Sequence, residues 1–532
     1  MALSAADIIA IRLYDAGVRH AFGIPGGEVL ALIDALERVG IRFHLAKHEN
    51  AAGFMAEGTW HATGAPAVLV ATVGPGVANA FNVVANAEQD RVPLIVLSGM
   101  VDPAEALSYT HQVFDHQAVF ARVCKGSFQA TNGAVDVMMD KALALAMAPR
   151  KGPVHIDVPI AVAAAEQPAP RQPGRGAVLP TAPSGEALAD ARARFAAAER
   201  PVMVVGLDVL EEPGGPETVR RFAEANGVPI ATTYKAKGVL PEDHPLCLGG
   251  HGLSPKADAI LMSVFSEADC VIAAGYDPIE MRTGWRDPWD PAKCIEFAHA
   301  PNTHDMHHAA MSWVCSVSAG LTALDGARAQ PARWMGGGRR QSLLEAFAPR
   351  DAWGPDRAMA EMLQVMPAEA AVTVDSGAHR ILLSQQFFAA RPRMLMQSTG
   401  LCTMGCALPL ALGHKIAEPE RPAIAVMGDA CFEMVLGELA TLRDSRLPVV
   451  IIVLVDRSLA LIELKQRRMG LQNAGVDFER TAFADLARLY GGEGLSVRGP
   501  GEAAAALETA LAAELFAVIE IEIPRRAYDG LI

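Results

Sequence analysis

The chain has 532 residues, 51% hydrophobic and 20% charged, so it can bury several cores and is not a disordered protein. At roughly 150 residues per domain, this length predicts three to four domains. The formal net charge of −14 disfavours a nucleic-acid-binding protein, which usually carries a basic face. No apolar run reaches the ~20 residues of a membrane span. The eight scattered cysteines, without a CxxC pair, favour a cytoplasmic protein with reduced thiols.

Apolar runs suited to buried parallel strands alternate with helix-period stretches from the start of the chain. In the first block, strands are predicted at Ala67–Thr72, Pro93–Ser98 and Val154–Val158, and a helix over Glu28–Val39. This alternation predicts a doubly wound α/β domain over residues 1–162.

Two weakly patterned stretches divide the rest of the chain. A proline-rich stretch at 163–188 is predicted to be a linker, followed by an α/β domain over 189–328. A second linker at 329–355 contains the GGGRR run and precedes a third α/β domain over 356–532. The fold class is therefore α/β with three doubly wound parallel-sheet domains, and the first and third domains look alike. The strands predicted in the later domains are Pro201–Gly206, Val228–Thr233, Cys270–Gly275, Cys294–Ala298, Ala371–Gly377, Met394–Gln397, Ala423–Met427, Val449–Asp456 and Ala517–Ile523.

The stretch 422–456 predicts a strand, a tight turn of small residues, a helix with Met434 and Leu439 on one face, and a second strand. Backbone N–H groups at the start of such a helix bind phosphate readily. Asp429 lies in the turn and Asp456 ends the second strand, so both carboxylates are expected at one edge of adjacent strands, beside a phosphate and Mg²⁺. On spacing alone, a turn and a helix cap explain the two aspartates about equally well.

The same stretch, GDACFEMVLGELATLRDSRLPVVIIVLVDRS, resembles the thiamine diphosphate motif of the acetolactate synthase and benzoylformate decarboxylase superfamily. The resemblance implies thiamine diphosphate as the cofactor, with Asp429 and Asp456 as side-chain ligands of Mg²⁺ and the Ser458 carbonyl as a third ligand. Asp456 stands where Asn is usual, as in the catabolic acetolactate synthases. The turn residues that would bind the cofactor beside Asp429 are Gly428, Ala430 and Cys431.

The segment KHENAAGFMAEG, Lys47–Gly58, resembles the family segment that carries the catalytic glutamate, and Glu49 is the matching residue. In this chemistry, a carboxyl group hydrogen-bonds to the aminopyrimidine of the cofactor, which then removes the C2 proton of the thiazolium ring. The apolar neighbours of Glu49, Ala51, Ala52 and Phe54 among them, would keep that contact dry. Without the resemblance, a lone glutamate after a strand is usually a surface residue.

Two further loops of the first domain match family segments around the cofactor. Gly23–Glu28 (GIPGGE) is expected to lie over the thiazolium, with Gly26 and Gly27 facing the substrate. Thr72–Asn79 (TVGPGVAN) matches the loop against the pyrimidine, where the expected contacts are Pro75 and Asn79.

In the third domain, Ser398–Ala411 (STGLCTMGCALPLA) resembles the family segment GGLGTMGFALP. The resemblance places Met404 where a bulky residue holds the cofactor bent, which brings its 4′-nitrogen close to C2. The carbonyl of Cys402 would accept a hydrogen bond from the 4′-amino group. The residues matched to diphosphate binding are Gly377, Ala378 and His379, and Leu461 and Ile462 would line the pocket.

Two segments favour the catabolic, FAD-independent acetolactate synthases. Ala273–Arg282 (AAGYDPIEMR) resembles their GYDPIEY segment, and Tyr109–Phe120 (YTHQVFDHQAVF) resembles THQSLDNAALF. Gln112 matches a glutamine near the active site, with His111 beside it. The resemblance implies decarboxylation of a 2-oxo acid and carboligation of the product to a second carbonyl compound. It also implies a homodimer or homotetramer with active sites between subunits; FAD is possible but not expected.

Glu28 departs from the family pattern, because relatives usually carry a small or basic residue there. A negative charge at this position disfavours a second anionic substrate. A simple 2-oxo acid decarboxylase of the benzoylformate decarboxylase type, and an aldehyde carboligase or lyase, are the alternative functions. Retention of Glu49 and both aspartates argues against a non-catalytic regulator, and the lack of GxGxxG after the first strand of each block argues against a nicotinamide dehydrogenase.

Overall fold

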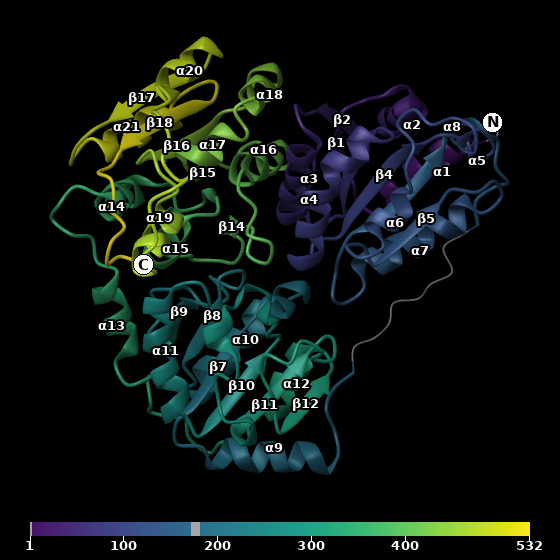
Figure 1. Cartoon of the computed structure of the whole chain (residues 1–532). Helices are drawn as coiled ribbons and strands as arrows, with labels where there is room; N and C mark the ends of the chain where they lie inside the picture. Colours follow the sequence, from purple (N-terminus) through teal and green to yellow (C-terminus); the bar gives the residue numbers. More distant parts are fainter. Residues whose placement is uncertain (1–2, 172–180) are drawn as a thin grey trace.

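The computed structural model describes residues 3–171 and 181–532, which form three α/β domains (Figure 1). Each domain is built on one six-stranded sheet, and the paired strands run parallel in all three sheets. The predicted fold class is therefore confirmed. The domain limits given above stay predictions, and part of the first predicted linker, 172–180, lies outside the described residues.

The first domain has the strand order β2-β1-β3-β4-β6-β5. Its inner strands are the apolar runs seen in the sequence, and β3 and β6 are buried along their whole length. Its elements are α1 (Ala5–Asp15), β1 (His20–Gly23), α2 (Leu30–Val39), β2 (Arg42–Leu45), α3 (Glu49–Thr63), β3 (Ala67–Ala71), α4 (Pro75–Gln89), β4 (Leu94–Met100), α5 (Pro103–Ala106), α6 (His116–Phe120), β5 (Gly126–Gln129), α7 (Val135–Met147), β6 (Val154–Pro159) and α8 (Ile160–Ala164).

The central domain has the strand order β12-β11-β10-β7-β8-β9. Its elements are α9 (Glu186–Ala197), β7 (Pro201–Val205), α10 (Gly215–Asn226), β8 (Ile230–Thr233), β9 (Cys247–His251), α11 (Pro255–Glu267), β10 (Cys270–Ala274), β11 (Cys294–Ala298), β12 (Met311–Val314) and α12 (Val317–Leu324). The predicted second linker is not wholly irregular, because it contains α13 (Arg339–Ala346).

The third domain has the strand order β14-β13-β15-β16-β18-β17. Its elements are α14 (Pro355–Val365), β13 (Ala371–Val374), α15 (Ala378–Gln386), β14 (Leu395–Gln397), α16 (Ala407–Ala417), β15 (Ala423–Gly428), α17 (Asp429–Glu433), α18 (Glu438–Ser445), β16 (Val449–Val455), α19 (Ala460–Arg468), α20 (Phe483–Leu489), β17 (Glu493–Val497), α21 (Ala503–Leu511) and β18 (Ala517–Glu522).

The first and third sheets share one topology, as their similar sequence pattern suggested. Numbered within each domain, both have the order 2-1-3-4-6-5, whereas the central sheet has 3-2-1-4-5-6, the order of dinucleotide-binding sheets. In the first and third sheets the chain changes direction across the sheet between β1 and β3 and between β13 and β15. Ligands of open parallel sheets bind beyond the carboxyl ends of the strands at such a point.

The first and third domains share a continuous apolar core in which α3 packs against α16 (Figure 1). The two helices approach so closely that a Cβ on Gly413 would lie 1.8 Å from the carbonyl oxygen of Met55. Beside them, Asp90 of the first domain accepts hydrogen bonds from the backbone of Thr399 and Gly400 and pairs with Lys235 of the central domain at 3.5 Å. All three domains therefore meet around this buried aspartate.

One predicted helix is wrong in detail. The helix after Asp429 is two short helices, α17 and α18, separated by a turn that ends at Gly437, so Met434 is 62% exposed instead of lying on a buried face. Glycine favours such an interruption because it loses more conformational freedom in a helix than other residues. No helix among the described residues is long and apolar enough to cross a membrane. The eight cysteines are free thiols.

Candidate active site

A cavity of about 230 Å³ lies beyond the carboxyl ends of β13, β15 and β16. Every residue that the sequence predicted for the third-domain half of the site lines it. They are Gly377, Ala378, His379, Cys402, Met404, Gly428, Asp429, Ala430, Cys431, Asp456, Ser458, Leu461 and Ile462. Segments from four parts of the domain therefore converge on one space.

Asp429 and Asp456 are both buried, 3% and 9% exposed, at the ends of adjacent strands. Burial raises the pKa of Asp429 to about 6, and burial together with the Asp429 charge raises the pKa of Asp456 to about 7. Oδ2 of Asp456 is buried without a hydrogen-bond partner among the described residues. The Ser458 carbonyl accepts one hydrogen bond, from Ala460, and keeps a second lone pair. Two repelling carboxylates with an unsatisfied oxygen fit a divalent cation, which takes oxygen ligands.

One end of the cavity is formed by the start of α15. Gly377 precedes the helix, and the buried ring of His379 packs over Gly377 and Gly428. Burial and the charge of Arg380 lower the pKa of His379 to about 3, so the ring is neutral. The backbone N–H groups at this helix start are suited to an anion. Arg380, which the sequence did not single out, donates to the Ser398 carbonyl.

Two more residues of this site, Asp375 and Tyr528, were not predicted from the sequence. Asp375 directly follows β13 and accepts hydrogen bonds from the backbone N–H groups of Ser376, Gly405 and Ala407. It therefore fixes the segment that carries Met404. It lies directly after the apolar run Ala371–Val374, inside the strand predicted at Ala371–Gly377, and this position is a signal that could have identified it. Tyr528 is buried in the cavity wall, and burial and the nearby aspartates raise its pKa; no sequence pattern marks it.

The first-domain half of the predicted site centres on Glu49. It occupies the first position of α3, is 5% exposed, and accepts a hydrogen bond from Nδ2 of Asn79 at 3.0 Å. Pro75 begins α4, and a Cβ on Gly76 would lie 3.3 Å from Oε1 of Glu49. The dry surroundings expected from the sequence are present, because Ala51, Ala52 and Phe54 are buried.

Much of the first-domain half of the predicted site is exposed to solvent on the surface of the chain. Gly27, Pro75, Asn79, His111 and Gln112 are exposed, and no first-domain residue lines the third-domain cavity in the described part of the chain. Large apolar side chains are also exposed nearby: Phe81, Leu107, Tyr109 and Phe114. Within one chain, the two predicted halves therefore do not form one pocket.

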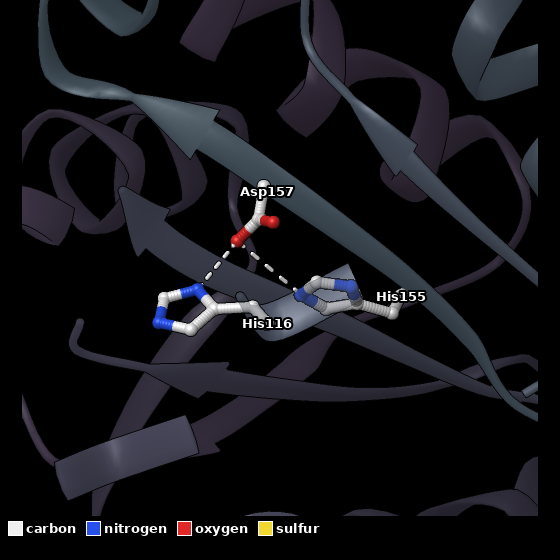
Figure 2. A group of neighbouring side chains, drawn as sticks. All are labelled: His116, His155 and Asp157. Atoms are coloured by element: carbon white, nitrogen blue, oxygen red, sulfur yellow. Dashed lines mark hydrogen bonds and ion pairs between the residues drawn. The ribbon is translucent and has the colours of Figure 1, made fainter. Parts of the chain in front are cut away.

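Behind Gly74 lies a buried group formed by His116, His155 and Asp157 (Figure 2). Their ligand atoms are close enough to share a metal ion, but hydrogen bonds account for the ring nitrogens. Gly74 N–H donates to Nε2 of His116 at 3.3 Å, and Nδ1 of His116 contacts Asp157 at 2.8 Å. Both nitrogens of His155 contact serine hydroxyls, those of Ser98 and Ser127, at 2.7 Å. The group is a hydrogen-bonded support for the loop that begins α4.

The shared topology of the first and third sheets, the buried acid of the first domain and the cavity of the third, with a helix start suited to an anion, are typical of one class, the enzymes that use a diphosphate cofactor. Family models agree with this class. The N-terminal TPP binding domain of the thiamine pyrophosphate enzymes matches residues 3–119, the central domain matches 188–324 and the C-terminal TPP binding domain matches 375–521. The chain belongs to the thiamine pyrophosphate enzymes and is acetolactate synthase-like.

Curated relatives match along most of the chain. It is 32% identical to the acetolactate synthase isozyme 1 large subunit of Escherichia coli, over 87% of this chain and 83% of the relative. It is 28% identical to an acetolactate synthase of Bacillus subtilis, over 97% and 93% of the two chains. It is also 30% identical to the probable 2-ketoarginine decarboxylase AruI of Pseudomonas aeruginosa, over 92% and 88%.

Proposed function

We propose that the protein catalyses the thiamine diphosphate- and Mg²⁺-dependent decarboxylation of a 2-oxo acid and the carboligation of the product to a second carbonyl compound. The observation that carries this proposal is the single cavity in which all thirteen predicted third-domain residues meet. When bound, the cofactor would supply the electron sink for loss of CO₂.

The residues of this chain would bind and orient that cofactor. Asp429, Asp456 and the Ser458 carbonyl would hold Mg²⁺, and the N–H groups at the start of α15 would contact the diphosphate. Met404 and the Cys402 carbonyl would set the position of the aminopyrimidine. Glu49 would hydrogen-bond to its ring nitrogen, with Asn79 orienting the carboxyl group.

We further propose a homodimer or homotetramer in which Glu49 of one subunit meets the third-domain cavity of another. The separation of the two halves within one chain supports this arrangement, as do the exposed apolar side chains around the first-domain half. We expect the enzyme to act in the cytoplasm without FAD.

Product analysis tests the proposed function. The purified protein is given thiamine diphosphate, Mg²⁺ and a panel of 2-oxo acids that includes pyruvate, and CO₂ and organic products are measured by mass. A 2-hydroxy-3-oxo acid product is expected and requires both added cofactors. Absence of CO₂ release from every acid would refute the proposal.

Simple decarboxylation is the second candidate, because one of the relatives carries the name of a 2-ketoarginine decarboxylase. The same experiment separates the two candidates. An aldehyde as the only product, at any concentration of an added second carbonyl compound, would favour the decarboxylase over the carboligase.

A further inference from the structure

Helix α4, which packs along α3 (Figure 1), carries three asparagines on one face. Asn79, Asn82 and Asn86 are three and four residues apart, so their side chains form one row along the helix. Asparagine favours a helix less than alanine or leucine does, so helix stability does not explain this row. The row begins beside Glu49, which Asn79 contacts, and continues with Asn82, whose amide lies 3.4 Å from Oγ1 of Thr403 in the third domain.

The last asparagine of the row, Asn86, is fully buried and joins the first domain to the third. Its Oδ1 accepts a hydrogen bond from Oγ of Ser398 at 2.5 Å. The same Oγ accepts a hydrogen bond from the backbone N–H of Thr403 at 3.0 Å. Thr403 lies between Cys402 and Met404, which both line the third-domain cavity. One side chain of α4 therefore fixes a hydroxyl group that fixes the backbone of this cavity wall.

The 398–404 segment contains a strained turn at Cys402. The φ of Cys402 is 57°, a left-handed backbone that a non-glycine residue keeps only where its surroundings hold it. On one side, Arg380 donates to the Ser398 carbonyl and contacts Sγ of Cys402 at 3.4 Å. On the other side, Asp90 at the end of α4 accepts hydrogen bonds from the backbone of the two residues after Ser398. The carboxyl end of α4 thus holds one flank of this turn.

The hydrogen bond of Asn86 is not needed to keep the two domains together. They already share a continuous apolar core along α3 and α16. A buried hydrogen bond adds little net stability, because both groups give up their hydration, but it fixes the distance and direction of the groups that it joins. Both polar groups of the Asn86 amide are paired, since its Nδ2 donates to Glu57 at 3.2 Å. We therefore expect Asn86 to contribute geometry more than stability.

We propose that Asn86, acting through Ser398, positions the 398–404 segment for the cofactor in the cavity of its own chain. This inference rests on the proposed function, in which that segment contacts the aminopyrimidine. The other end of α4 orients Glu49, which in the same proposal serves the cavity of another subunit. Helix α4 therefore supports two active sites of the dimer, one at each end.

Cofactor affinity tests the position of Asn86. In full-length Asn86→Ala and Ser398→Ala enzymes, we expect the Kd for thiamine diphosphate, measured by fluorescence quenching with Mg²⁺, to rise about tenfold. The kcat should fall, whereas the KM for the 2-oxo acid should stay unchanged. The control is Asn226→Ala, which removes a buried asparagine with two hydrogen bonds at the end of α10 and should leave this Kd unchanged. An unchanged Kd in both folded site variants, or an equal rise in the control, contradicts the inference.

Mixed dimers then show which active site Asn86 serves. In a dimer of Asn86→Ala and Glu49→Gln chains, both changes fall in one site if Asn86 acts on the cavity of its own chain, so about half of the parent activity per chain should remain. A dimer of Asn86→Ala and Asp429→Ala chains then has no intact site and should show far less. The reverse order, or equal activity of the two pairs, overturns the inference. Absence of CO₂ from every acid overturns the proposed function and leaves the cofactor affinities to decide the role of Asn86, whereas a parent enzyme that does not bind thiamine diphosphate overturns both.

Discussion

Glu49 combines two properties that the proposed chemistry needs in one side chain. It is buried at the start of α3, so water does not compete for it, and Asn79 holds one of its oxygens. The other oxygen faces Gly76, whose missing side chain leaves room for a ring to approach.

We expect Glu49→Gln to reduce kcat by at least about a hundredfold while the protein still binds thiamine diphosphate, because the amide cannot share a proton with the cofactor ring. Turnover is measured by CO₂ release and cofactor binding by fluorescence quenching. Asn79→Ala should cause a smaller loss, since it only frees the carboxyl group to rotate. Full turnover of the Glu49→Gln enzyme with bound cofactor would show that the acid is elsewhere.

The residues of the third-domain site could be predicted because they belong to contiguous motifs at strand ends. Asp429 and Asp456 follow apolar runs that only buried strands explain, and small residues mark the turn between them. Tyr528 could not be found in this way, because its place in the cavity depends on how the end of the chain packs. The hydrogen bond between Glu28 and Thr72 was equally invisible, since it joins loops that only the tertiary fold brings together.

Among the strands, most of the inner ones were predicted and most of the edge strands were not. The inner strands β3, β7, β10, β15 and β16 are buried on both faces and therefore read as continuous apolar runs. The edge strands β2, β5, β12 and β17 have one open side and carry polar residues, so they lack that pattern. The edge strand β9 is buried but contains two glycines, which disfavour a strand prediction.

The contact between α3 and α16 depends on glycine for its closeness. Gly413 lies inside α16, where alanine would ordinarily stabilise a helix by about 1 kcal/mol. Here the added methyl group would overlap the Met55 carbonyl, so we expect Gly413→Ala to destabilise the protein by about 1–3 kcal/mol. Urea unfolding measures the change. Gly284→Ala, at an exposed position with no atom within 4 Å of the new Cβ, is the matched control; equal effects of the two substitutions would contradict the close approach.

At the scale of the molecule, the junction of the three domains contains two buried acids. Burial and the charge of Asp90 raise the pKa of Glu57 to about 8, well above its ordinary value near 4.5. The folded protein therefore holds a proton that the unfolded chain releases between these two pH values, so stability falls as pH rises through this window.

Glu57→Gln should remove that dependence, because the amide can keep the contacts with Asn86 and His61 without a charge. At pH 8 we expect the variant to be more stable than the parent by up to about 4 kcal/mol, with the difference vanishing towards pH 4.5. Urea unfolding across this range measures it, and Glu508→Gln, at an exposed position, provides the control. If the stability curves of parent and variant run parallel, Glu57 is ionised in the folded protein over this whole pH range, and the raised pKa is contradicted.

The largest consequence of the fold is that one chain does not complete the proposed site. If Glu49 of one subunit serves the cavity of another, a dimer of Glu49→Gln and Asp429→Ala chains contains one site with both acids intact and one site with both changed. Each variant alone should be inactive, whereas the purified mixed dimers, with one intact site of two, should show about half of the parent activity per chain. Co-expression with two affinity tags and assay of the doubly tagged dimers measures this. Sites formed within single chains would give no recovery, since every site would then carry one of the two changes.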